Sequence, residues 1–235
     1  MALPRSVFSS PNVTVLFKPA NSKITIHKDI LVKASPYFAE LLAQGTNGAQ
    51  TYEVNFPNWF SNETVTGFVH WAYYGAIDPR HLSAFLSIYL KDSWLLAHKL
   101  RMLQWQNRLI DALIDTCWKN RRVEIDELTW LIRNVPKDSK LFKLAWDQFA
   151  YDISDRGVKY DDGELKRLFD FTSLSICDIL HTVASIAKRE EPIADRTRYY
   201  ETENIENADA DETQERKRGR SMSLGGTTSE RPKSD

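Results

Sequence analysis

Three short segments with alternating apolar and polar residues constrain the fold of this chain more than any other feature. Val13–Phe17 and Lys23–His27 alternate on either side of a turn-rich connection, which is the pattern of a β-hairpin. Thr51–Phe56 alternates in the same way and predicts a third strand. No regular strand–helix–strand repeat follows, so the order of elements predicts an α+β fold in which helices pack on a small sheet.

Start and stop signals place helices between and after these strands. Ser35–Pro36 combines a residue that caps helix N-termini with a proline suited to the first helical position. Ser61 or Asn62 can cap a further helix, and Gly75 is placed to end it. Residues 84–118 carry two more amphipathic patterns. The sequence therefore predicts a three-stranded sheet flanked by a cluster of helices.

Periodicity and composition divide the chain into four regions. Residues 1–11 form a short N-terminal arm, and residues 12–118 form the predicted α+β domain. Residues 119–188 show only helical periodicity, and their apolar faces need a partner surface, so we expect this extension to pack on the domain. Residues 189–235 contain a run of acids, Glu201–Glu215, followed by a basic run, and such a composition predicts a disordered tail.

Charge and cysteine content narrow the environment and the partners. The formal net charge of −1 argues against nucleic acid as a direct partner, since such proteins usually carry a clear basic excess. Cys117 and Cys177 lack metal-site spacing and are interpreted as buried thiols in a reducing compartment. We find neither a secretory signal nor an apolar stretch of the ~20 residues that a membrane span requires. The prediction is an intracellular protein of the cytoplasm, the nucleus or both, without membrane contact.

The polar residues do not assemble into a recognisable reaction site. No histidine, cysteine or carboxylate lies at metal-ligand spacing from His27, so a packing role is preferred over catalysis for it. Ser35 belongs to a helix-start signal rather than to the strained turn that presents a catalytic serine. The sequence predicts no catalytic residue, no cofactor and no metal ligand, and therefore a protein that is not an enzyme.

Two strings resemble the signature of the BTB/POZ domain. FKPANSKITIHKDILVKASPYF spans Phe17–Phe38, and WLLAHKLRMLQWQNRLIDAL spans Trp94–Leu113. Between them, His70–Gly75 stands where the family usually has a Tyr-x-Tyr-(Thr/Ser)-Gly segment. The resemblance covers residues 12–118. Residues 134–152 resemble the helical region that follows the BTB domain in many fungal members.

The resemblance implies a structural role for its matching residues and an interaction role for the chain. The matching residues are His27, Lys28, Leu31, Ser35, Pro36, Phe38, Ala97 and Asn107. The implied function is a non-catalytic protein–protein interaction module, an adaptor or oligomerisation domain, with a cullin scaffold of a ubiquitin ligase as a candidate partner. The alternative is a regulator of transcription or chromatin that acts through a protein partner.

Two departures from the family pattern bear on self-association. Many BTB domains pair an acid before the first strand with a base after the histidine at the dimer seam, and here these positions hold Asn12 and Lys28. The pair is thereby reduced to a hydrogen bond at most. Only eleven residues precede Asn12, which is short for the N-terminal helix that many dimeric members exchange. We therefore expect the usual homodimer to be weak or missing, which frees the helices around Leu82–Trp94 for another protein.

Two further groups of residues are candidates for recognition. Among the tryptophans, Trp59 follows the third predicted strand in a loop and is expected to be an exposed contact, like Asn12 and Lys28. The basic run near the C-terminus is a candidate import signal, and the serines beside it are a candidate kinase site. These residues are Arg216, Lys217, Arg218, Arg220, Ser221 and Ser223.

Overall fold

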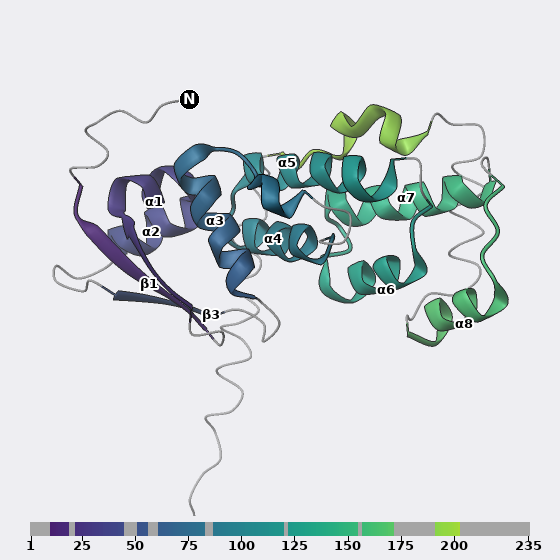
Figure 1. Ribbon diagram of the computed structural model, residues 1–235, viewed down its shortest axis with the longest axis horizontal. Coiled ribbons are helices and arrows are strands. Elements are labelled where there is room, and N and C mark those ends of the chain that lie inside the picture. The colour runs from purple at the N-terminus through teal and green to yellow at the C-terminus, as the bar shows by residue number, and fades with distance from the viewer. Residues whose placement is uncertain are drawn as a thin grey trace, which may run out of the picture. The chain divides into compact units, whose positions relative to one another are not determined.

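The computed structural model describes residues 10–18, 22–44, 51–55, 61–82, 87–119, 122–154, 157–171 and 191–202. The elements below all belong to one compact unit, residues 1–201 (Figure 1). In chain order they are β1 (Asn12–Lys18), β2 (Ser22–His27), α1 (Lys28–Ala34), α2 (Pro36–Gln44), β3 (Thr51–Asn55), α3 (Asn62–Tyr74), the 3₁₀ turn η2 (Pro79–His81), α4 (Ser87–Lys99), α5 (Leu103–Leu113), the π-helical turn η4 (Ile114–Trp118), α6 (Ile125–Asn134), α7 (Lys140–Ser154), α8 (Asp162–Phe171) and the 3₁₀ helix η5 (Pro192–Tyr199).

The three predicted strands form one mixed sheet in the order β2-β1-β3. β1 and β2 are the antiparallel hairpin that the alternation predicts, with Val13 opposite Ile26. β3 pairs with the other edge of β1 in parallel, with Phe17 opposite Val54. Alternate residues of β1 are buried, so one face of this central strand lies against the core. The predicted α+β class is confirmed; Phe56, the last residue of the predicted third strand, lies outside the described residues.

The helix boundaries follow from local capping chemistry. The Ser35 Oγ accepts a hydrogen bond from the Phe38 backbone N–H at 3.3 Å, as the Ser–Pro start signal predicts. Of the two candidate caps for α3, Ser61 takes the role, because its hydroxyl accepts from the Thr64 N–H. Gly75 ends α3 with a φ of 63°, a left-handed conformation that glycine adopts without the clash that a Cβ causes.

Phe68 on α3 is the centre of the aromatic core. Its ring lies 6.0 Å from Phe17 of the sheet, 6.0 Å from Phe38 of α2 and 6.1 Å from Trp105 of α5, measured between ring centroids. All four side chains are at most 2% exposed. This cluster therefore joins the sheet, the short helices and the α4–α5 layer through direct packing.

The substitution Phe38→Ala tests this core. Removing a fully buried phenylalanine side chain loses its transfer free energy and leaves a cavity, so the free energy of unfolding should fall by about 3–5 kcal/mol. Urea denaturation measures the change. The control is Tyr74→Ala, which truncates a residue that is 68% exposed and should alter stability by less than about 0.5 kcal/mol. A Phe38→Ala protein as stable as the parent would contradict the packing.

Glu127 joins the α+β region to the helical extension. Its carboxylate on α6 accepts a hydrogen bond from the Trp118 indole N–H at 3.2 Å and pairs with the Lys91 ammonium of α4 at 3.5 Å. The same ammonium lies 5.3 Å from the centroid of the Trp130 ring on α6. Lys91 is only 5% exposed, so this pair is shielded from solvent and from salt. These contacts join α6 to α4 and to η4.

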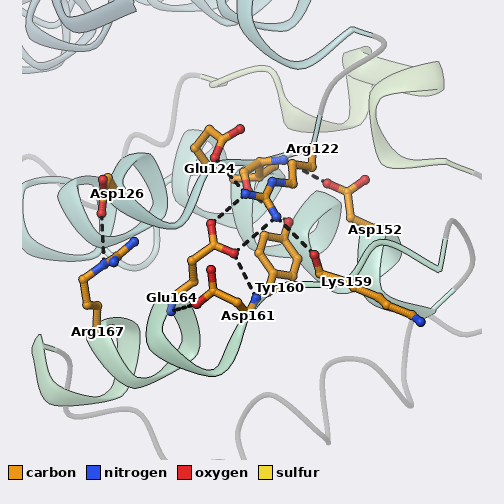
Figure 2. Close-up of polar contacts among 10 residues, drawn as sticks. Arg122, Glu124, Asp126, Asp152, Lys159, Tyr160, Asp161, Glu164 and Arg167 are labelled. Atoms are coloured by element: carbon orange, nitrogen blue, oxygen red, sulfur yellow. Dashed lines mark hydrogen bonds and ion pairs between the residues drawn. The ribbon is translucent and has the colours of Figure 1, made fainter.

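A second polar cluster holds α8 within the extension (Figure 2). The Arg122 guanidinium donates to Glu164 at 2.6 Å, stacks 4.9 Å from the Tyr160 ring centroid, and donates to the Lys159 carbonyl. The Tyr160 hydroxyl donates to the Val123 carbonyl at 2.9 Å, and burial raises the pKa of this hydroxyl. The cluster fixes the loop before α6 against the loop before α8.

Residues 191–201 correct the predicted start of the tail. The sequence assigned residues 189–235 to a disordered tail, but Pro192–Tyr199 forms η5 and packs against α7. Ile193 is 8% exposed and Tyr199 is 1% exposed, so both side chains belong to the core. Two apolar residues six positions apart carry no helical periodicity, which is why the pattern did not reveal them. Cys177, which the sequence predicts to be a buried thiol, lies outside the described residues.

Asp92 is a buried acid on α4 whose charge is poorly satisfied. The residue is 5% exposed, and its Oδ1 atom has no hydrogen-bond partner. Burial raises the pKa of this carboxyl to about 7, and the neighbouring Lys91 only partly offsets the effect. Because the pKa is higher in the folded state, folding favours the protonated acid. This contribution to stability is complete below about pH 4, near the unfolded pKa, and is lost as the pH rises through about 7.

We therefore expect Asp92→Asn to stabilise the protein in a pH-dependent manner. At pH 8 the amide removes a buried charge, and the free energy of unfolding should rise by about 1–3 kcal/mol, with a smaller gain at pH 5. Urea denaturation at the two pH values measures this difference. Asp126→Asn, which changes a side chain that is 83% exposed, is the matched control. An equal effect of Asp92→Asn at both pH values would exclude the predicted titration.

Candidate protein-interaction surface

His27 connects the sheet to the helices. It is the last residue of β2, and its Nδ1 atom lies 2.8 Å from the Tyr73 hydroxyl of α3 in a hydrogen bond. The two rings also meet edge to face, with centroids 6.0 Å apart. The side chain thereby holds the end of the hairpin against α3.

The Ser-Pro-x-Phe segment, residues 35–38, contributes buried side chains and a helix cap to the core. Leu31, Ser35 and Phe38 are completely buried. Besides capping α2, the Ser35 hydroxyl donates to the Leu100 carbonyl at 2.8 Å, which joins the α1–α2 connection to the end of α4. Pro36 is the first residue of α2, where its missing N–H leaves no helical bond unmade.

Ala97 and Asn107 occupy the second part of the motif, and their roles differ. Ala97 is fully buried, and its carbonyl accepts from the Met102 N–H at 2.8 Å where α4 turns into α5. Asn107 instead pairs its side-chain amide with the backbone of Glu201, accepting at 2.7 Å and donating at 3.1 Å. The motif gave no indication of this partner, because Glu201 lies 94 residues away in the region predicted to be a tail.

The seam residues Asn12 and Lys28 lie near each other where β1 begins and β2 ends, but their side chains are not joined by a hydrogen bond. Asn12 is exposed and stands opposite His27 in the hairpin register. The Lys28 backbone N–H donates to the Pro11 carbonyl at 2.9 Å. Within the described ranges, no side-chain hydrogen bond joins Asn12 to Lys28.

Large apolar side chains are exposed where α3 connects to α4. Tyr74 at the end of α3 is 68% exposed, Leu82 after η2 is 43% exposed, and Ile88 at the start of α4 is 40% exposed. We call these three residues the exposed edge. Exposed apolar side chains mark an interaction site where they form a contiguous patch, and these three are the candidates for one. The segment around Leu82–Trp94 was predicted to be exposed. Leu82 and Ile88 are exposed, whereas residues 90–94 are buried, so the prediction is wrong for that part.

The remaining candidates from the sequence have different outcomes. Trp59 and the six residues from Arg216 to Ser223 lie outside the described residues. Cys117 is buried, as predicted, and its Sγ atom lies 3.3 Å from the Thr116 hydroxyl. In the described part of the chain, no three histidine, cysteine, aspartate or glutamate side chains form a metal-ligand group. None of the described helices is both long enough and apolar enough to cross a membrane.

A comparison with models of known protein families identifies the domain that these motif residues form. Residues 8–116 match the family model of the BTB/POZ domain, a range that runs from just before β1 into η4. This part of the chain is a BTB/POZ domain. A comparison with curated proteins finds no match.

The BTB/POZ match accounts for the structural role of the motif residues. His27, Ser35 and Phe38 hold the sheet, the α1–α2 pair and α4 in the BTB arrangement, and a BTB domain implies a protein–protein interaction or adaptor role. Among the described residues of this region, Asn12 and the exposed edge are accessible to solvent.

Proposed function

We propose that this protein is a non-catalytic adaptor that binds a helical scaffold protein through the exposed edge of its BTB domain. The observation that carries the proposal is the exposure of Tyr74, Leu82 and Ile88 on one connection of a domain whose other large apolar residues are mostly buried. Covering such side chains releases water from apolar surface and provides the main driving force for association. The helical extension supplies a further surface, since the Glu127 contacts attach its helix α6 to α4 and η4.

A cullin scaffold of a ubiquitin ligase is the proposed partner. BTB adaptors of this kind carry a substrate with one part of the chain and the scaffold with the BTB domain. The exposed edge supports this assignment, because it combines an aromatic residue with two aliphatic residues at the ends of helices. Aromatic residues are enriched among those that dominate interface energies.

The test is binding of the full chain to a purified cullin scaffold by biolayer interferometry. Changing Tyr74, Leu82 and Ile88 together to Ser should weaken binding by at least about tenfold, because each side chain would otherwise be desolvated in the complex. Val32→Ser is the matched control, since Val32 is also exposed, at 36%, but lies on α1. Melting curves should be nearly unchanged in both. Equal binding by the triple variant would exclude the edge as the docking site.

We also propose that the BTB homodimer is weak or missing. The seam position that many relatives fill with an acid holds Asn12, whose side chain makes no hydrogen bond to Lys28 in the described ranges. A stable dimer typically buries about 800 Å² on each partner, and loss of a seam ion pair removes part of its specificity. Light scattering on the full chain at micromolar concentration should give mainly monomer. A dimer that persists on dilution would contradict this.

A regulator of transcription or chromatin is the second candidate function, and the sequence of the C-terminal region favours it. Seven acids in Glu201–Glu215 precede the basic run that begins at Arg216, a pattern compatible with nuclear import and protein recruitment. Imaging of the tagged full chain separates the two candidates. Exclusive nuclear signal that becomes cytoplasmic when Arg216, Lys217 and Arg218 are changed to Ala would favour the regulator.

A further inference from the structure

The segment Glu191–Glu201, which we call the strap, lies across α5 and α7, outside the motif region of the BTB domain. In Figure 1 it is the yellow-green coil beside these two helices. Its apolar anchors are Pro192, Ile193 and Tyr199, and Tyr199 is the most deeply buried at 1% exposed. The remaining contacts are polar and follow a regular pattern.

The α5 side of the contact is a stripe of polar residues at a spacing of four. Asn107, Asp111 and Asp115 therefore lie on one face of α5 and its π-helical extension. Asp111 accepts from the Tyr200 hydroxyl at 2.7 Å, and Asp115 accepts from the Arg196 guanidinium at 3.0 Å. The Asn107 side-chain amide accepts a hydrogen bond from the Glu201 backbone N–H and donates one to the Glu201 carbonyl. Along the stripe, Asn107 therefore binds a peptide group, Asp111 a tyrosine hydroxyl and Asp115 a guanidinium.

The α7 side supplies complementary groups. Asp147 accepts from the Tyr199 hydroxyl at 2.9 Å, and burial raises the pKa of that hydroxyl to about 12. The Gln148 side chain accepts from the Ile193 backbone N–H at 3.3 Å. The Glu201 carboxylate accepts from the Lys140 N–H at 2.8 Å, at the first residue of α7, where the helix dipole favours a negative charge.

Three features indicate that the strap is held weakly. It is a 3₁₀ helix of eight residues interrupted at Asp195, whereas 3₁₀ runs longer than three or four residues are uncommon because their hydrogen bonds are poorly aligned. The ion pair between Arg196 and Asp115 is solvent-exposed, with Asp115 half exposed. A cavity of about 480 Å³ remains beside the strap, lined by residues that include Ile114, Tyr151 and Ile193. Elements of this kind open at low free-energy cost.

We propose that α5 and α7 form a peptide-binding groove, and that the strap is an internal occupant which a partner protein displaces with a segment of the same chemistry. Such a segment carries an aliphatic residue, an arginine three positions later, and a Tyr-Tyr-acid sequence after a further two residues. The polar stripe selects the arginine and the second tyrosine, and the N-terminus of α7 selects the acid. The groove is separate from the exposed edge, so either site can fail its test while the other passes.

Competition with a labelled peptide tests the proposal. The peptide EPIADRTRYYE, the sequence of Glu191–Glu201, is titrated with full-length protein and followed by fluorescence anisotropy. The full-length variant Ile193→Ser/Arg196→Ala weakens the internal strap and should bind the peptide at least about tenfold more tightly than the parent, because a tethered occupant competes at high effective concentration. Adding Asp111→Asn and Asp115→Asn should reverse that gain by about tenfold, since these carboxylates accept the peptide's Tyr200 and Arg196.

Controls make each outcome decisive. Asp126→Asn in the same strap-weakened background should leave peptide binding unchanged, and a scrambled peptide should not bind. A folded strap-weakened variant that ignores the peptide would overturn the proposal. Hydrogen exchange on the unaltered protein decides the matter if that variant does not fold. The amides of residues 193–200 should exchange at least about a hundredfold faster than those of Leu109–Leu113, and equally slow exchange would show that the strap is a permanent part of the core.

Discussion

The packing of Phe68 against Phe17, Phe38 and Trp105 is the interaction on which the rest of the structure depends. These rings come from the sheet and from three different helices, so no local segment can form the cluster alone. Large aromatic side chains bury more area than any others, and their close packing compensates for a sheet of only three strands. Once the cluster has formed, Ser35 and His27 add directional hydrogen bonds that fix the orientation of the surrounding helices.

The charged residues that hold the helical extension follow a different logic from this apolar core. Lys91 of α4 pairs with Glu127 of α6, and Arg122 pairs with Glu164 of α8, because a shielded charge without a partner would lose its hydration without compensation. Paired charges require one specific geometry, whereas apolar surfaces tolerate several. The Lys91–Glu127 pair therefore joins α6 to α4, and the Arg122–Glu164 pair holds α8 against the loop before α6.

Local chemistry made much of this structure predictable. The hairpin, the cap at Ser35 and the stop at Gly75 depend on residues within a few positions of one another, so the sequence alone predicts them. The ordered spacing of the BTB motif also predicts the domain, which the family match confirms. The motif does not distinguish packing residues from contact residues. Asn107 belongs to the motif, yet its partner is the backbone of Glu201, in a segment whose acidic composition predicts a tail.

The sequence by itself determined the α+β class, the three strands and the residues that start and end the main helices, because backbone geometry and capping act over short distances. Only the tertiary structure decided that β3 pairs in parallel with β1, that the strap joins the core, and which apolar residues stay exposed. Each of these outcomes depends on surfaces from elements far apart in the chain. Leu82 and Trp94 bound one segment that was predicted to be exposed, but the tertiary packing buries the tryptophan completely and leaves the leucine 43% exposed.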